Sequence, residues 1–260
     1  MTPRWSKAQR GLALVSVLWG VAILSLIAAT MLTASVTTAY IDRNVWNRTR
    51  AASLDDAAVN RAILLLMDDR KHPRVDGAPS NFRFDGAVVR LRIQDEAGRI
   101  NLNFADKEML QRLFASAGVA RDAAAQLADR VVAHRTLKPG AAIAFRNLDE
   151  LRDIPGVTPA IYARVTPLIT AFGQTTSVDP SVAPREVLAL LPDMTPDAIT
   201  LALKDRAQKQ DLPTTSALAI QGSTYTIWAD ATVGGARVQR VAVVQFTADK
   251  ANPYLFLGWH

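Results

Sequence analysis

The feature that most constrains this 260-residue chain is its first quarter, where no proline occurs between Pro3 and Pro73. An uncharged run extends from Leu12 to Ile41, and its first two dozen residues are strongly apolar. Beyond it, apolar residues recur at spacings of three and four, as an amphipathic helix requires, at Ala51, Leu54, Ala58, Ala62 and Leu65. The pattern predicts one helix from about residue 12 to residue 71, roughly 90 Å long at 1.5 Å per residue.

The apolar run is long enough to span a bilayer, because about 20 apolar residues suffice. Arg4, Lys7 and Arg10 precede it without an acidic residue, so the short basic end is expected in the cytoplasm and the remainder outside it. Three interpretations compete: a cleaved secretory signal with a site near residues 28–29 or 33–35, a plain signal anchor, and a type IV prepilin leader cut at Gly11–Leu12. The third is favoured because Gly11 directly abuts the apolar run and the helical pattern continues beyond it.

The next segment is predicted to form strands. Val89, Leu91 and Ile93 alternate with Arg90, Arg92 and Gln94, after a hairpin closed by Asp85-Gly86. A second hairpin is predicted around Gly234-Gly235, with Ile227, Ala229, Ala231 and Val233 alternating before it and residues 238–246 returning. The last apolar stretch, YLFLGW, could add an edge strand.

Between these two β regions, residues 95–216 have a helical pattern with an internal repeat. Each repeat consists of a helix, a tight turn and a second helix. The turns fall at Gly118-Val119, at Pro155-Gly156-Val157 and at residues 192–197. The sequence therefore predicts a helical domain, built from helix-hairpin-helix units, inserted between strands.

This order of elements resembles the minor pseudopilin K family of type II secretion systems over nearly the full mature length. The matching segments are QRGLALVSVLWG, DEAGRINLN, FRNLDELRDIPGVT, TSVDPSVAPREVLALLP and ADATVGGARVQR. The resemblance implies an α+β fold in which a pilin-like long N-terminal helix packs on a small antiparallel sheet. The expected division is a leader (1–11), a transmembrane part (12–34), a pilin-like domain in two parts (35–94 and 217–260) and the helical insertion (95–216).

The resemblance also implies functional positions. Prepilin peptidase would cleave between Gly11 and Leu12 and then methylate the new amino group of Leu12. Ordinary pilins carry glutamate at the fifth position after cleavage, and here that position is Ser16, an absence that marks the K subunit. Implied partners are the minor pseudopilins I and J, the peptidase and the inner membrane, with the bulk of the chain in the periplasm. The implied role is at the pseudopilus tip, where it helps initiate or cap the filament that drives folded proteins across the outer membrane.

The alternative is a membrane-anchored DNA-binding protein of the competence type, because helix-hairpin-helix modules hold phosphate with backbone N–H groups. The charge distribution opposes it. The net charge of +6 arises in residues 1–94, whereas residues 95–212 have 14 Lys and Arg against 15 Asp and Glu. In the best hairpin the second glycine is replaced by Thr158, and Pro159 has no N–H. We therefore expect no nucleic acid partner.

Neither catalysis nor a small-molecule substrate is expected. His72, His134 and His260 match no metal-ligand spacing, cysteine is absent, and no phosphate-binding glycine loop occurs. Asp55-Asp56 and Asp68-Asp69 are interpreted as solvated, and Asp149, Glu150 and Asp153 as a helix start. Calcium binding would follow from the family resemblance alone. The oxygen-rich turns are Asp95-Glu96 with Asn101 and Asn103, and Ser177 with Asp179, but these residues equally suit turn capping. No catalytic, cofactor or metal residue is assigned.

Overall fold

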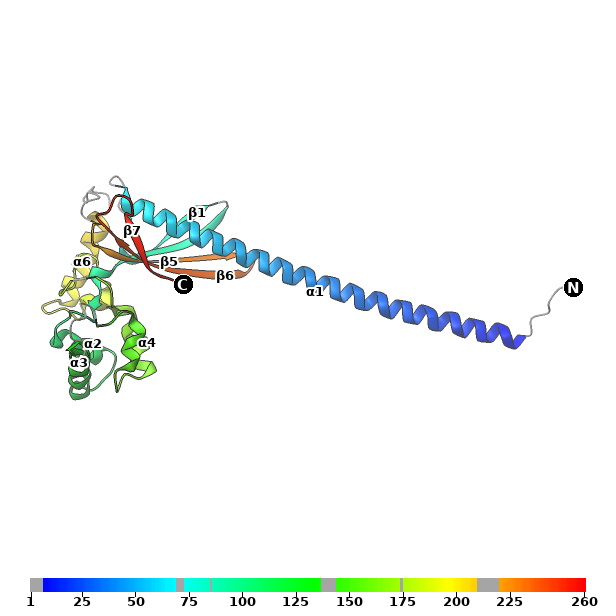
Figure 1. The fold of residues 1–260 in the computed structure, drawn as a ribbon, viewed down its shortest axis with the longest axis horizontal. Helices are drawn as coiled ribbons and strands as arrows, with labels where there is room; N and C mark the ends of the chain where they lie inside the picture. The colour runs from blue at the N-terminus through cyan, green and yellow to red at the C-terminus, as the bar shows by residue number, and fades with distance from the viewer. Residues whose placement is uncertain (1–6, 69–72, 85, 137–143, 174, 210–219) are drawn as a thin grey trace.

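A computed structural model describes residues 7–68, 73–84, 86–136, 144–173, 175–209 and 220–260; within the first helix it describes the side chains of 15–28 and from residue 40 onward. Helix α1 (Lys7–Met67) is one continuous element that projects far from the globular part (Figure 1). The single long helix predicted from the sequence is confirmed, with its end at Met67. The predicted end at Lys71 lies outside the described residues.

A five-stranded antiparallel sheet packs against the last third of α1 (Figure 1). Its strands, in spatial order, are β1 (Asp76–Phe84), β2 (Ala87–Asp95), β5 (Thr224–Val233), β6 (Ala236–Phe246) and β7 (Tyr254–Trp259). Strands β2 and β5 are neighbours in the sheet although more than a hundred residues separate them in the sequence. The helical segment is therefore inserted between two paired strands, and the predicted α+β fold class is confirmed.

The face of α1 that meets the sheet is narrow and built largely from alanine. Ala51, Ala58 and Ala62 are fully buried, and their small side chains let the helix backbone approach the strands closely. Leu54 belongs to the same buried face, whereas Leu65 is only half-buried. Ile63 and Leu66 take its place in the core, so the predicted helix face is wrong in its last turn. The sheet contributes Val89, Leu91, Ile93, Ile227, Ala229 and Val244, among others.

Both predicted hairpins form, and the register shows why. Phe84 pairs with Ala87 in the first, and Val233 pairs with Ala236 in the second. Gly234 and Gly235 have φ of 55° and 85°, the two positive values that a two-residue type I′ turn needs. Strand β7 pairs with β6 at the sheet edge, as the last apolar stretch predicts.

The insertion has its own apolar core, separate from that of the sheet. Its elements are η1 (Glu96–Gly98), β3 (Ile100–Asn101), α2 (Lys107–Ser116), α3 (Arg121–Thr136), η2 (Leu148–Asp153), α4 (Pro159–Val165), η3 (Thr166–Leu168), β4 (Ile169–Thr170), α5 (Arg185–Leu188) and α6 (Pro196–Lys209). The first repeat forms two full helices. The second begins with the 3₁₀ helix η2, and the third begins with the single turn α5. The three repeats therefore differ in the length and type of their first helix. Strands β3 and β4 form a short parallel pair.

Candidate functional site: the N-terminal helix and its surroundings

Residues 15–28 of α1 lie beyond the sheet, and mainly apolar side chains surround this part of the helix. Every residue from 15 to 28 is exposed. Trp19 and Leu24 are each 68% exposed, and Leu26 is 67% exposed. A helix that is apolar on all sides is stable only where an apolar medium or other helices cover it. This segment is therefore an intermolecular surface.

The predicted processing site lies at the start of this helix. Gly11 and Leu12 belong to the helical backbone of α1, while their side chains are outside the described set, as is most of the predicted leader, residues 1–6. Ser16 is exposed within the apolar segment. Among the helices, as far as they are described, none has an apolar stretch long enough to cross a membrane. The predicted span, 12–34, lies partly outside the described side chains.

Asp55 is buried, and the prediction that it is solvated is wrong. Its side chain on α1 is 0% exposed, and neither carboxylate oxygen forms a hydrogen bond with a described residue. Burial raises its pKa to about 7, with further contributions from Asp230 and Asp56, whereas Arg240 acts in the opposite direction. The helical period does place Asp55 on the buried face, because it lies four residues after Ala51 and three before Ala58, whereas the neighbouring Asp56 turns outward. Asp56 accepts a hydrogen bond from Arg240 Nε at 3.0 Å and thereby joins α1 to β6.

Asn101 and Asn103 were suggested as oxygen ligands. Their side chains instead form hydrogen bonds with the backbone of distant segments of the insertion. The Asn103 side-chain oxygen accepts from the amides of Ala144 (3.0 Å) and Phe145 (2.7 Å). Its amide nitrogen donates to the carbonyls of Phe145 (2.9 Å) and Ala171 (3.1 Å). All four hydrogen bonds available to this side chain are made. The Asn101 amide likewise donates to the carbonyls of Phe172 and Gly173.

The acidic turn at Asp95-Glu96, also suggested as a source of oxygen ligands, stabilises local backbone structure. Asp95 caps η1 by accepting from the Ala97 amide at 2.9 Å. Burial raises its pKa to about 6, and Glu96 and Asp179 add to the increase. Asp179 accepts from the Ser181 amide at 2.8 Å. Within the described residues, no group of three or more His, Asp or Glu side chains could hold a metal ion.

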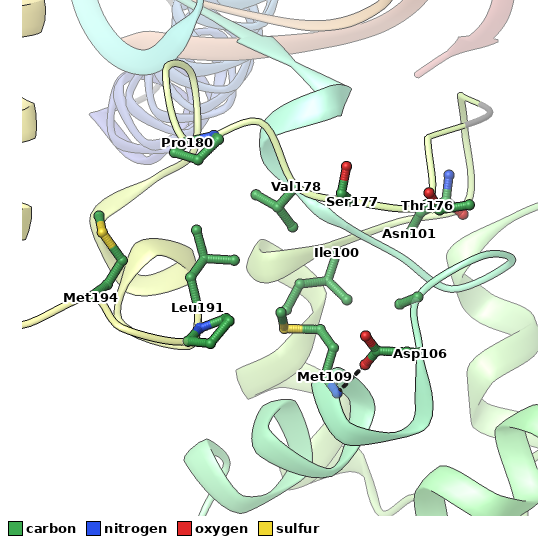
Figure 2. A pocket seen from close by; sticks show the side chains of 12 residues that line it. Ile100, Asn101, Asp106, Met109, Thr176, Ser177, Val178, Pro180, Leu191 and Met194 are labelled. Carbon is green, nitrogen blue, oxygen red and sulfur yellow. Dashed lines mark hydrogen bonds between the residues drawn. The ribbon is translucent and has the colours of Figure 1, made fainter.

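A cavity of about 380 Å³ opens between the start of α2 and the loops at residues 176–180 and 191–194. Figure 2 shows Ile100, Met109 and Leu191 directed into it, with the Ser177 hydroxyl at its edge. The Asp106 carboxylate on its wall is occupied, because it accepts from the Met109 amide at 2.6 Å. The cavity is mainly apolar, and its polar lining residues are Asn101, Asp106, Thr176 and Ser177.

The hairpin of the second repeat is closed by contacts within the protein. Thr158 caps α4 by accepting from the Ile161 amide at 3.2 Å. The carbonyl of Pro155 accepts from Arg130 of α3 at 2.5 Å, and that guanidinium also lies against Gly156. Several arginines of the insertion donate to backbone carbonyls in the same way: Arg112, Arg130, Arg135, Arg164 and Arg206. Arg112, Arg130 and Arg164 join one repeat to another, whereas Arg135 and Arg206 bond carbonyls of their own repeat. The sequence repeat predicts none of these bonds.

The remaining expectations concern the acidic residues at the start of η2, the histidines and Asp69. Asp149 and Glu150 lie in the first turn of η2, and Glu150 bonds the Asn147 side chain that caps it, as expected for a helix start. His134 packs against Phe145 with ring centroids 4.8 Å apart. Asp69 and His72 lie outside the described residues.

Comparison with solved structures finds a structural likeness. No protein-family model matches the chain, and no curated protein matches it. A solved structure that is similar is the crystal structure of the GspK-GspI-GspJ complex from the type 2 secretion system of enterotoxigenic Escherichia coli. Sequence identity to the matched chain is 14%, the match covers 87% of this chain and 98% of that chain, and the TM-score is 0.45.

Proposed function

We propose that this chain is a minor pseudopilin of a type II secretion system, anchored in the bacterial inner membrane through α1 with its globular part in the periplasm. It would lie at the tip of the pseudopilus together with the I and J minor pseudopilins. There it would help initiate or cap the filament that drives folded proteins across the outer membrane. The proposal assigns it no catalytic activity and no cofactor.

The observation that carries this proposal is the continuity of α1. Its first described part, residues 15–28, is exposed and mainly apolar, and its last part is buried against the sheet through Ala51 and Ala58. Cleavage of a signal peptide within the apolar run would remove the apolar part of α1, and the unbroken connection between that part and the globular domain would then serve no purpose. A helix that holds a globular domain at one end and enters an apolar bundle or bilayer at the other suits a filament subunit.

The tip position is supported by two further features. Ser16 offers no carboxylate to pair with the amino group of a neighbouring subunit, and a lone carboxylate in apolar surroundings would be costly. The insertion between β2 and β5 projects from the sheet (Figure 1), where it would obstruct a subunit stacked on that end. A subunit with these features needs neighbours on one side only.

Processing at Gly11–Leu12 provides the primary test. Replacing Gly11 with Val should block cleavage by prepilin peptidase while membrane insertion continues, because the leader is recognised at that glycine. Intact-mass measurement of the membrane fraction, with and without the peptidase, should give a wild-type chain that begins at methylated Leu12 and an uncleaved variant. A mature chain beginning between residues 31 and 36 would contradict the proposal, because it would indicate an ordinary signal peptide.

A further inference from the structure

The sheet face opposite α1 carries a tryptophan flanked by two arginine side chains. In the antiparallel register Arg92 of β2 lies directly across from Trp228 of β5. The guanidinium carbon of Arg92 is 4.9 Å from the centroid of the Trp228 ring, and that of Arg99 is 5.1 Å from the same ring. Both distances are within the range of about 6 Å over which a cation is attracted to an aromatic face.

Positive charge extends across this face. Strand alternation and register put the exposed side chains of Arg83, Arg90 and Arg237 on the same side of the sheet. We call the set formed by Arg83, Arg90, Arg92, Arg99, Arg237 and Trp228 the arginine face. Two carboxylates lie among these cations. Asp230 is held by Arg237, and Glu96 is 3.4 Å from Arg99. Five guanidinium groups against two carboxylates leave a positive excess.

The arginines at the centre are incompletely neutralised. Burial lowers the pKa of Arg92, and the neighbouring charges of Arg90 and Arg99 lower it further, whereas Asp230 acts in the opposite direction. The Nε of Arg99 is buried and makes no hydrogen bond with a described residue. Like charges gathered where water is partly excluded repel one another, so an incoming carboxylate would relieve this repulsion.

We propose that the arginine face binds an acidic segment of a partner protein, with carboxylates against Arg90 and Arg92 and an apolar side chain against Trp228 and Val88. Val88 lies on the same face and is 49% exposed. Tryptophan and arginine are the residue types that most often dominate the binding energy of protein interfaces. This proposal is independent of the tip assignment, since it concerns only the globular part.

A protein partner fits this face better than a nucleic acid or a membrane. Val88 and Trp228 lie among the arginines, and a phosphate backbone has no apolar group to place against them. The predicted membrane part of α1 ends at residue 34, which is 17 residues before Ala51 and thus about 26 Å away along the helix at 1.5 Å per residue. A membrane that holds that segment would not reach the arginine face.

The test uses the full-length chain in detergent micelles and a fluorescein-labelled peptide of twelve residues with alternating Glu and Ser. A peptide of alternating Gln and Ser is the neutral control. Fluorescence anisotropy should detect binding of the Glu peptide, weakened by added salt, and no comparable binding of the Gln peptide. Arg92→Glu and Arg90→Glu should each weaken binding at least tenfold. Arg121→Glu, an exposed arginine of α3 with the same change of net charge, should alter it less than twofold.

Arg90→Glu guards against a folding artefact, because Arg90 is exposed whereas Arg92 is partly buried. An equal loss in all three variants would mean a general charge effect and would overturn the proposal. So would the absence of binding by the wild-type chain. Stronger binding of a 12-nucleotide DNA strand, or of phosphatidylglycerol vesicles, with loss on Arg90→Glu would replace the protein partner with that ligand.

Discussion

The side-chain amide of Gln94, near the end of β2, donates a hydrogen bond to the carbonyl oxygen of Val182 at 3.0 Å. The two residues are 88 positions apart, and the bond joins the sheet to the far end of the helical insertion. The same amide also donates to the Asp95 carbonyl at 2.7 Å. Gln94 is only 1% exposed, so the expectation that it faces solvent like Arg90 is wrong: the insertion folds over this end of the strand.

Val182 also explains a sharp requirement for glycine at position 98. A Cβ on Gly98 would lie 2.5 Å from the carbonyl oxygen of Val182 and 2.9 Å from the Cα of Ala183. Gly98→Ala must therefore displace backbone, and we expect the free energy of unfolding to fall by about 1–3 kcal/mol. Thermal unfolding in detergent measures this. Gly258→Ala is the matched control, because its Cβ would meet its nearest atoms at 3.5 Å. Equal effects of the two substitutions would contradict the account.

Asn103→Asp should loosen the insertion, although it changes one atom. The two donors to the carbonyls of Phe145 and Ala171 are lost, and a carboxylate oxygen replaces them. A buried carbonyl left without a hydrogen-bond donor costs about 1–3 kcal/mol of stability, and a buried charge beside it costs more. Hydrogen exchange of the Ala144 and Phe145 amides should accelerate. Asp106→Asn is the control, because an asparagine oxygen caps α2 as well as a carboxylate does. Unchanged exchange in Asn103→Asp would argue against this role.

Asp55 should make stability depend on pH. Its pKa is about 7 in the folded chain, well above the ordinary value of 3.8. Between about pH 4 and pH 7 the folded chain keeps a proton that the unfolded chain has lost, so stability falls as the pH rises through this window. The limiting change is about 4 kcal/mol. Chemical denaturation of the full-length chain at pH 5 and pH 8 measures the part of this change that lies between those two values, about 2–3 kcal/mol.

Asp55→Asn should remove most of that difference between pH 5 and pH 8, because the amide does not titrate. Asp56→Asn should leave the difference largely in place, because Asp56 is 41% exposed and its pair with Arg240 contributes at most about 1 kcal/mol. A wild-type chain with equal stability at both pH values would show that Asp55 is not buried as described.

Introducing Glu at Ser16 tests whether the insertion or the missing carboxylate limits the filament. We expect Ser16→Glu to be processed normally and still not to form long filaments, because the insertion between β2 and β5 remains. Electron microscopy after overexpression measures this. Co-purification of the part beginning at about Asn44 with the I and J partners should give a one-to-one-to-one complex. Long filaments composed mainly of this chain would remove the tip assignment.

We expect the full-length chain to bind DNA weakly at physiological salt, since non-specific affinity depends on phosphate contacts. Five arginines of the insertion are engaged with backbone carbonyls, and its hairpin at Asp193 carries a carboxylate. A fluorescence titration with duplex DNA measures the affinity and its salt dependence. Micromolar binding with a steep salt dependence would favour the competence-type alternative.

The local elements follow from short-range patterns in the amino-acid sequence. The proline-free first quarter specifies a continuous helix, and alternation of Val89, Leu91 and Ile93 specifies a half-buried strand. Gly234-Gly235 specifies a tight hairpin because only glycine adopts two successive positive φ angles without strain. These features depend on neighbours within a few positions, so a pattern can reveal them.

The contacts between residues far apart in the sequence depend instead on how the elements pack in three dimensions. The burial of Asp55 depends on which turn of α1 the sheet covers, and the burial of Gln94 depends on the insertion closing over β2. The pairing of Arg92 with Trp228 follows from the register of β2 against β5, which the intervening residues of the insertion conceal. A register shift of one residue would turn these side chains to the opposite face, and no local pattern fixes that register.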